Sequence, residues 1–144
     1  MISFFADREK NVDRAALVLR LVLAAGFIGH GYQKVFGMGL SNMGGMFAHM
    51  GVPLPGLAGP LIAVLELTAG FAFLFGIFTR VFGFLIACDM LGAMIFVHAA
   101  GGFFAPKGVE LVLGNFAMAT ALFFLGAGSY SVDALLGRRG APAP

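Results

Sequence analysis

Residues 59–100 read GPLIAVLELTAGFAFLFGIFTRVFGFLIACDMLGAMIFVHAA, an apolar run that is interrupted near its middle by Thr79 and Arg80. A helix needs about 20 apolar residues to cross about 30 Å of hydrocarbon. The run is long enough for two such helices, over 59–78 and 81–100, with a tight turn between them that carries one positive charge. The stretch therefore predicts a helical hairpin that spans a membrane.

Two further apolar segments, 15–36 and 109–127, have nearly the same length. Of the 144 residues, 60 % are hydrophobic and 11 % are charged. Soluble domains carry about 25 % charged residues, so we expect a lipid bilayer to cover much of this apolar surface. We predict an all-α integral membrane protein in which residues 15–127 form a bundle of four transmembrane helices.

Lysine and arginine residues indicate the orientation of the bundle, because they are enriched at the cytoplasmic ends of membrane spans. Six of those that flank the predicted spans lie on one side and two on the other. The six are Arg8, Lys10, Arg14, Arg80, Arg138 and Arg139, and the two are Lys34 and Lys107. Both termini are therefore predicted to be cytoplasmic, with residues 1–14 as an N-terminal segment and residues 128–144 as a frayed tail.

The composition argues against several classes of function. A formal net charge of +2 provides no basic surface for nucleic acid. The single cysteine, Cys88, cannot form an internal disulfide, and no CxxC motif is present for redox or metal chemistry. The N-terminal residues lack the order of a signal peptide, since their charges follow the short apolar start. No pair of histidines sits at matched central depth on opposite spans, so we do not predict haem. We also predict no metal ion as a cofactor, although the sequence leaves copper binding by the outer loop undecided.

Ionisable side chains within membrane spans are costly and are the first candidates for function. Seven lie in or at the ends of the predicted spans: Arg20, His30, Lys34, Glu66, Asp89, His98 and Glu110. At about 1.5 Å per residue, His30 lies roughly 7 Å and Glu66 roughly 10 Å below the outer boundary. Lys34, His98 and Glu110 lie close to that boundary. Each span thus contributes a polar group to one layer in the outer half of the bundle.

This layer contains the candidate site. We assign His30 and Glu66 as a proton relay, with a buried hydrogen-bonded pair that only fixes helix register as the alternative. The candidate ligand-binding residues are Gln33, Lys34, His98 and Glu110. Two of these have simpler interpretations. Lys34, like Lys107, suits an anchor at the membrane interface, and a carboxylate such as Glu110 is favoured in the first turn of a helix by the helix dipole.

Arg20 and Asp89 lie deeper, and we interpret both as structural charges. Unpaired they would be expensive to bury. An Arg20–Asp89 pair is possible, since the long arginine side chain can bridge a depth difference of several ångströms. Asp89 and His98 are nine residues apart, half a turn out of phase at 100° per residue. They cannot both point inward on a straight helix. His98 either lies past the helix end, near Gly101 and Gly102, or faces elsewhere, and we expect the first.

The predicted outer loop between the first two spans is rich in sulfur. It contains Met38, Met43, Met46, His49 and Met50. Thioethers and imidazole are ligands that suit Cu(I). The alternative is a short amphipathic helix that lies on the membrane, with methionines as apolar filling. The sequence does not decide whether this loop binds copper.

Four stretches together resemble the DoxX family. They are LRLVLAAGFIGHGYQKVFG (19–37), AVLELTAGFAFLFGIFTR (63–80), MIFVHAAGGFF (94–104) and GAGSYSVDALL (126–136). The resemblance covers residues 14–136, and the order and spacing of the stretches are more specific than any one of them. It implies a small four-helix protein of the bacterial inner membrane with a DoxX-like domain. The family-pattern positions are His30, Lys34, Glu66, Arg80, His98 and Glu110, of which Arg80 belongs to a cytoplasmic turn that orients the bundle.

The DoxX family includes DoxD-type subunits of thiosulfate:quinone oxidoreductase and members associated with thiol and oxidative-stress systems. The resemblance therefore favours the membrane subunit of a redox system that binds quinone near the outer leaflet. Phe27, Phe71 and Phe73 would form the walls around the ring, and a soluble redox partner would supply electrons. If the subunit is catalytic, it is part of an oxidoreductase with quinone as acceptor. The alternatives are a non-catalytic scaffold for soluble redox enzymes, or a small-solute carrier that would need to form homo-oligomers.

Overall fold

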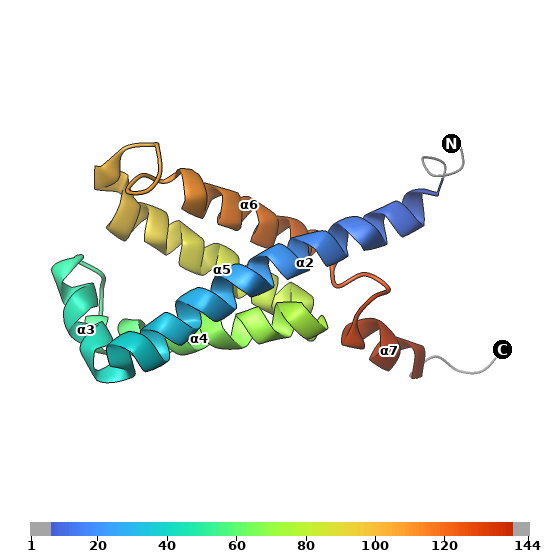
Figure 1. The fold of residues 1–144 in the computed structure, drawn as a ribbon, viewed down its shortest axis with the longest axis horizontal. Coiled ribbons are helices and arrows are strands. Elements are labelled where there is room, and N and C mark those ends of the chain that lie inside the picture. The colour runs from blue at the N-terminus through green and yellow to red at the C-terminus, as the bar shows by residue number, and fades with distance from the viewer. Residues whose placement is uncertain (1–6, 140–144) are drawn as a thin grey trace.

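The computed structural model describes residues 7–139, except for the side chains of residues 138 and 139, and this part of the chain is helical without strands (Figure 1). The elements are α2 (Arg8–Tyr32), η1 (Gln33–Gly39), α3 (Leu40–His49), α4 (Pro55–Phe75), α5 (Thr79–Ala93), η2 (Met94–His98), η3 (Ala99–Gly101), α6 (Glu110–Leu125) and α7 (Val132–Arg139). The predicted all-α class is therefore confirmed. The parts of the predicted cytoplasmic segments that fall on residues 1–6 and 140–144 lie outside the described residues.

Two of the predicted spans correspond to helices that are long and apolar enough to cross a membrane. These are Pro55–Phe75, with 21 residues, and Thr79–Gly101, with 23 residues. The apolar helix α6 is shorter, with 16 residues. The first predicted span differs most, because α2 begins at Arg8 and the helical path continues through η1 into α3. The count of four spans and the orientation of the termini stay predictions.

The long helices pack as two pairs that diverge from one end of the molecule to the other (Figure 1). Helix α2 lies along α4, and α5 lies along α6. Smaller contacts of α2 with α6 and of α4 with α5 join the pairs. The pairs meet toward α7 and separate toward α3 and η2. The molecule is therefore wedge-shaped, with a tied end and an open end.

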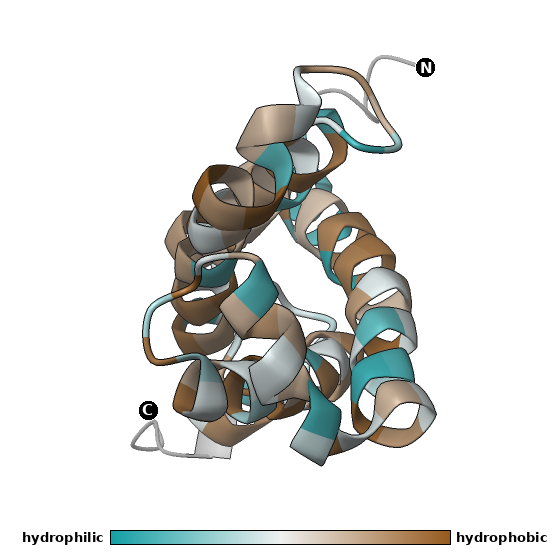
Figure 2. Cartoon of the chain, turned by 90° about the vertical axis from the view of Figure 1, so that its left-hand side faces the viewer, coloured by the Kyte–Doolittle hydropathy of each residue, from teal (hydrophilic) through white to brown (hydrophobic). Residues whose placement is uncertain are grey.

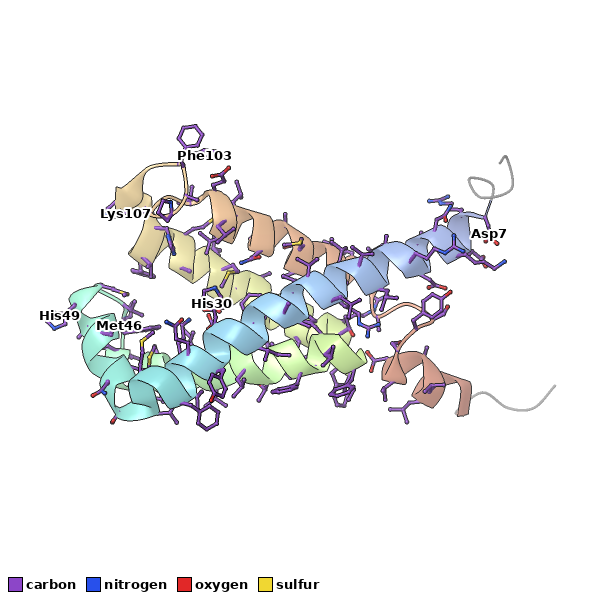
Figure 3. All side chains as sticks on the ribbon, viewed as in Figure 1. Asp7, His30, Met46, His49, Phe103 and Lys107 are labelled. Atoms are coloured by element: carbon purple, nitrogen blue, oxygen red, sulfur yellow. The ribbon has the colours of Figure 1, made fainter. Side chains whose placement is uncertain are left out.

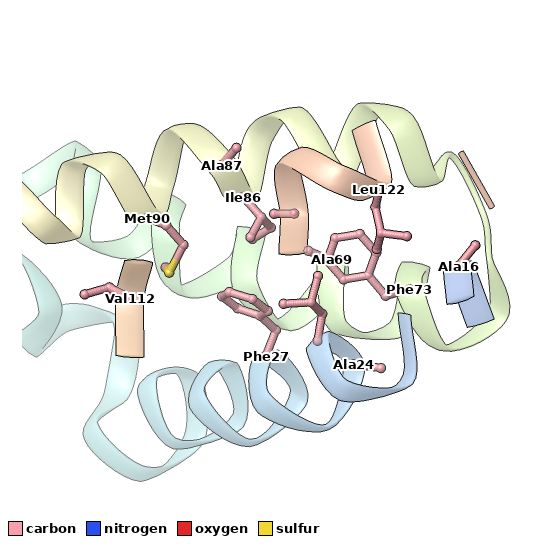
Figure 4. Packing of buried hydrophobic residues seen from close by; sticks show 12 residues of the cluster. Ala16, Ala24, Phe27, Ala69, Phe73, Ile86, Ala87, Met90, Val112 and Leu122 are labelled. Atoms are coloured by element: carbon pink, nitrogen blue, oxygen red, sulfur yellow. The ribbon is translucent and has the colours of Figure 1, made fainter. Parts of the chain in front are cut away.

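The core lies where the two pairs meet (Figure 4). Phe27, Phe73, Ile86 and Leu122, one from each long helix, are at most 3 % exposed. Hydrophobic residues are frequent along the long helices (Figure 2). Large side chains such as Leu61 and Phe124 are exposed. Such an outer surface suits contact with lipid.

Glycines allow α2 and α4 to approach closely. A Cβ atom built on Gly70 of α4 would lie 2.6 Å from the backbone nitrogen of Ile28 in α2. One built on Gly31 of α2 would overlap the backbone of Leu67 in α4. Small residues at such interfaces matter in lipid, where no hydrophobic effect drives helices together. Van der Waals contact between backbones therefore stabilises this pair.

We expect Gly70→Ala to lower the free energy of unfolding by about 2 kcal/mol, because the new methyl group must push two backbones apart. Gly26→Ala is the matched control on the partner helix, where nothing lies within 4 Å of the added Cβ atom. The control should gain up to about 1 kcal/mol from the higher helix propensity of alanine. Unfolding in detergent micelles measures both. Equal stability of the two variants would contradict the observed packing of α2 on α4.

Arg20 ties the first pair to the C-terminal segment. The residue is 1 % exposed, and its guanidinium group donates four hydrogen bonds to backbone carbonyls. The acceptors are the carbonyls of Phe73 at 2.8 Å, Leu74 at 3.1 Å, Ala127 at 3.0 Å and Tyr130 at 2.7 Å. The suggested Arg20–Asp89 pair is thus not formed. The last carbonyls of α4 lack intrahelical donors. The N–H donors of Arg20 bond to these carbonyls instead of to Asp89.

The segment after α6 is held at two further points, so it is not the free tail that we expected. The Asp133 carboxylate accepts hydrogen bonds from the backbone N–H groups of Phe78 (2.8 Å) and Thr79 (3.0 Å) at the start of α5. The backbone N–H of Asp133 donates to the carbonyl of Gly76 at 3.0 Å. In addition, the N–H of Ser129 donates to Asp13 in α2 at 3.0 Å. Helix α7 is therefore docked onto the α4–α5 turn.

Candidate functional site

A cavity of about 330 Å³ lies between the two helix pairs, in the half of the molecule where they diverge. Its polar lining comes from both pairs: His30, Lys34, Glu66, Asp89, His98 and Asn115. Apolar side chains, among them Phe27, Met46 and Val97, make up much of the remaining wall. His30 projects into the space between the pairs (Figure 3). An apolar cavity with a few convergent polar groups is the usual form of a ligand site.

The most buried of these charges, Glu66, is paired with Lys34. The lysine Nζ lies 2.6 Å from each of the two carboxylate oxygens. The Glu66 side chain is 4 % exposed and that of Lys34 is 19 % exposed. A full positive charge on a flexible stem satisfies a buried carboxylate better than a neutral imidazole does. The suggested His30–Glu66 pair is therefore replaced by a salt bridge, and His30 lines the cavity without a hydrogen-bond partner among residues 7–139.

Asp89 is the second carboxyl group of the cavity. It lies within hydrogen-bonding range of the Glu66 carboxyl group. Its Oδ2 atom is buried and has no hydrogen-bond partner in the described part of the chain. From the sequence we interpreted Asp89 as a structural charge that could pair with Arg20. The structure instead places it in the candidate site, beside the salt bridge.

His98 lies within the helical stretch, so the expectation that it falls past the helix end is wrong. It closes the π-helical segment η2, and the helical path continues to Gly101. A π-helix bonds residue i to i+5, so each residue turns the chain by less than in an α-helix. This brings His98 back toward the face of Asp89, and both line the cavity. The Nδ1 atom of His98 lies 3.1 Å from the Lys107 carbonyl, which can only accept, so Nδ1 donates and Nε2 is left for contact with a ligand.

Two π-helical segments occur at the open end of the wedge. One, η1, carries Lys34, and the other, η2, carries His98. They belong to different helix pairs and contribute to the same cavity. Departures of this kind from the α-helix are often found at functional sites, where they re-aim side chains.

Other candidates from the sequence lie away from the cavity. Gln33 is exposed and does not line it. Glu110 is also exposed, and its carboxylate accepts a hydrogen bond from the Ala105 backbone N–H at 3.1 Å, in the first turn of α6. Of the three phenylalanines that we expected around a ring, Phe27 lines the cavity, whereas Phe73 is in the core and Phe71 is exposed.

Asn115 is a cavity residue that the sequence reasoning missed, because only ionisable groups were considered. A signal exists, since Asn115 is a side-chain amide within the apolar helix α6. It lies three residues after the buried Val112, on the same helix face. A side-chain amide on the buried face of an apolar helix can contact a ligand as an ionisable group can.

The methionine-rich segment divides between the core and the cavity. Met43 of α3 is fully buried against α4. Met46 and Met50 line the cavity. His49 is exposed and lies at the outer edge of α3 (Figure 3). Within residues 7–139, no three His, Cys, Asp or Glu side chains are grouped so that they could hold a metal ion.

Arg80 lies at the other end of the molecule from this cavity. It is exposed in the first turn of α5, and its guanidinium approaches the Phe123 carbonyl at 3.5 Å. A second cavity, of about 450 Å³, lies there between the start of α5 and the segment that leads into α7. Arg80 therefore contributes nothing to the candidate site.

The sequence pattern of the DoxX family matches residues 15–99, more than half of the chain. The chain belongs to the DoxX family. The matched region contains five of the six polar cavity residues; Asn115 lies beyond it. The DoxX assignment agrees with the apolar outer surface, and the chain is a membrane protein of this family.

Individual DoxX-type relatives cover most of the chain. An uncharacterized protein of Haemophilus influenzae is 34 % identical over 80 % of this chain and 85 % of its own length. The protein of Bacillus subtilis named "Putative oxidoreductase CatD" is 33 % identical over 73 % of this chain and 75 % of its own. The inner membrane protein YqjF of Escherichia coli is 30 % identical over 91 % of this chain and 98 % of its own. No solved protein structure gives a significant match.

Proposed function

We propose that this protein is the membrane subunit of a redox system and binds a quinone in the cavity between its helix pairs. The observation that carries the proposal is the cavity itself. Its wall is largely apolar, while His30 and His98 enter from opposite pairs. A quinone ring needs such an apolar slot with a polar group near each of its carbonyls. The name of the Bacillus subtilis relative, which includes the word oxidoreductase, supports the same class.

The proposal includes an arrangement in the inner membrane with four spans: α2, α4, the stretch from α5 to η3, and α6. Both ends of the described chain lie at the tied end of the wedge (Figure 1). Arg8, Lys10 and Arg14 at the start of α2 favour the cytoplasm for that end. The cavity then faces the outer leaflet, where the apolar tail of a quinone can reach it through lipid.

Electrons would have to come from a partner protein. The sequence has a single cysteine, which is exposed on α5. Such a thiol cannot act as a dithiol relay. The docked surface formed by α7 and the α4–α5 turn lies on the proposed cytoplasmic side, where a soluble redox enzyme could bind. The proposed role of this chain is thus to hold the quinone and its proton-exchanging groups.

Titration of the purified protein with a short-chain ubiquinone analogue tests the proposal. We expect saturable binding that His30→Ala weakens about tenfold, because one polar partner of the ring is lost. Glu110→Gln is the matched control, since that side chain is outside the cavity. Absence of saturable binding by the wild-type protein, or equal binding by His30→Ala and Glu110→Gln, would contradict the proposal. Uptake of a small solute by proteoliposomes would favour the carrier alternative.

A further inference from the structure

The carboxyl groups of Asp89 and Glu66 lie side by side, and Lys34 is the one lysine or arginine among the residues that line their cavity. We propose that the two groups share one proton, and that Asp89 presents this proton to a carbonyl oxygen of an uncharged ligand. The choice of a carbonyl ligand rests on the proposed quinone function, whereas the shared proton does not. The inference follows from three observations: the Lys34–Glu66 salt bridge, the adjacent carboxyl groups of Glu66 and Asp89, and the buried Oδ2 atom of Asp89, which receives no hydrogen bond from the described part of the chain.

The first step concerns hydrogen-bonding capacity. An ionised carboxylate only accepts hydrogen bonds, so two ionised carboxylates side by side cannot form a hydrogen bond with each other. Both oxygens of Glu66 already accept from the Lys34 ammonium group. Asp89 lies within hydrogen-bonding range of Glu66. A single proton on Asp89 turns this contact from a repulsion between like charges into an attraction.

The second step concerns charge. Groups from every helix of the two pairs face Asp89 across the cavity: His30, Lys34, Glu66, His98 and Asn115. Lys34 is the single lysine or arginine among the residues that line it. One ammonium group balances one carboxylate, and a second ionised carboxylate would be buried without compensation, which is costly. With one shared proton, the lysine and the two carboxyl groups together carry no net charge.

The third step connects this charge balance to the ligand. A neutral site with a buried acidic proton suits an uncharged molecule that can accept a hydrogen bond, as a carbonyl oxygen does. When such a ligand binds, the proton of Asp89 turns from Glu66 to the oxygen of the ligand, while both oxygens of Glu66 keep their contact with Lys34. If both carboxyl groups were ionised, the site would carry a net negative charge and would instead select an organic cation. The two states thus predict opposite ligand classes.

Infrared spectroscopy of the full-length protein in lipid tests the shared proton without any ligand. We expect the wild-type protein at neutral pH to show the carbonyl stretching band of a buried, protonated carboxylic acid, and Asp89→Asn to lack it. Asp133→Asn, which changes an acid outside the cavity, is the control and should keep the band. A wild-type spectrum without the band at neutral pH would overturn the inference, whether or not a quinone binds.

Binding of two probes tests the ligand class. Asp89→Asn keeps a hydrogen-bond donor and should bind the short-chain ubiquinone analogue within about threefold of wild type, whereas Asp89→Leu should bind it about tenfold more weakly. Tetraphenylphosphonium, a lipophilic cation, should bind neither variant nor the wild type with saturation. Equal affinity of Asp89→Leu and wild type for the quinone, or saturable binding of the cation by wild type, would overturn the role of Asp89. A wild-type protein that shows the infrared band but binds no quinone would sink only the proposed function.

Discussion

Replacement of Arg20 by methionine is expected to lower the free energy of unfolding by about 4 kcal/mol, since each buried acceptor that loses its donor costs about 1–3 kcal/mol. The substitution removes the donor of four backbone carbonyls at once. Two of these belong to the end of α4 and two to the segment that leads into α7. The loss should therefore also release α7, which proteolysis or hydrogen exchange of residues 127–139 would detect.

Two further variants separate the geometry of Arg20 from its charge. Arg20→Lys keeps the charge but offers three donors on one compact group instead of a planar fork, and we expect it to restore less than half of the lost stability. Arg8→Ala removes an exposed arginine from the start of the same helix and should leave stability within about 0.5 kcal/mol of wild type. Unfolding in detergent micelles gives all three values. An Arg20→Lys protein as stable as wild type would show that the four carbonyl contacts matter little.

Replacement of Lys34 by methionine is expected to cost about 3 kcal/mol of stability, because breaking one side of a buried salt bridge leaves the other charge uncompensated. Glu66 is nearly inaccessible, and Asp89 lies beside it, so the loss of the ammonium group leaves two carboxyl groups facing each other. The double variant Lys34→Met with Glu66→Gln removes both charges of the salt bridge. It should recover most of the loss, since neutral groups of similar shape are tolerated where a lone charge is not.

Lys107→Met is the matched control for this experiment, because Lys107 is an exposed lysine at the same end of the molecule. Its removal should change stability by less than about 0.5 kcal/mol. Thermal unfolding of the four proteins in one detergent completes the comparison. If the double variant were as unstable as Lys34→Met alone, the coupling between Lys34 and Glu66 would be small, and the salt bridge would not be what stabilises this half of the protein.

The sequence was sufficient to predict the hairpin of 59–100, because segment length, apolar composition and a charged turn are all local features. The sequence also predicted similar depths for His30, Lys34, Glu66 and His98, since depth follows from counting residues along a helix. All four line the cavity. The sequence could not show which side chain pairs with Glu66. Whether Glu66 meets His30 or Lys34 depends on side-chain reach across a helix interface, and both residues lie on the same face of the first helix.

The two π-helical segments and the Arg20 hydrogen bonds could not be predicted from the sequence, for other reasons. An extra residue in one helical turn leaves no compositional mark, so the phase between Asp89 and His98 could not be corrected in advance. The acceptors of Arg20 are backbone carbonyls, which almost any residue can offer. A search for an acidic partner therefore pointed to Asp89, although the unsatisfied end of α4 was the better partner.

The two helix pairs diverge from a joint, the packed end around Arg20, toward the open end formed by α3 and η2. Lys34 follows Arg20 by 14 residues, which puts the joint about 21 Å from the salt bridge along a helical path. Because the core is closely packed near this joint, we expect a larger ligand to be accommodated by rotation of one helix pair against the other. Displacement would grow with distance from this joint, so α3 and the 102–109 loop would move farthest and the carbonyls around Arg20 least. The packing around Arg20 would therefore set the size of ligand that the cavity can accept, although that packing does not touch the ligand.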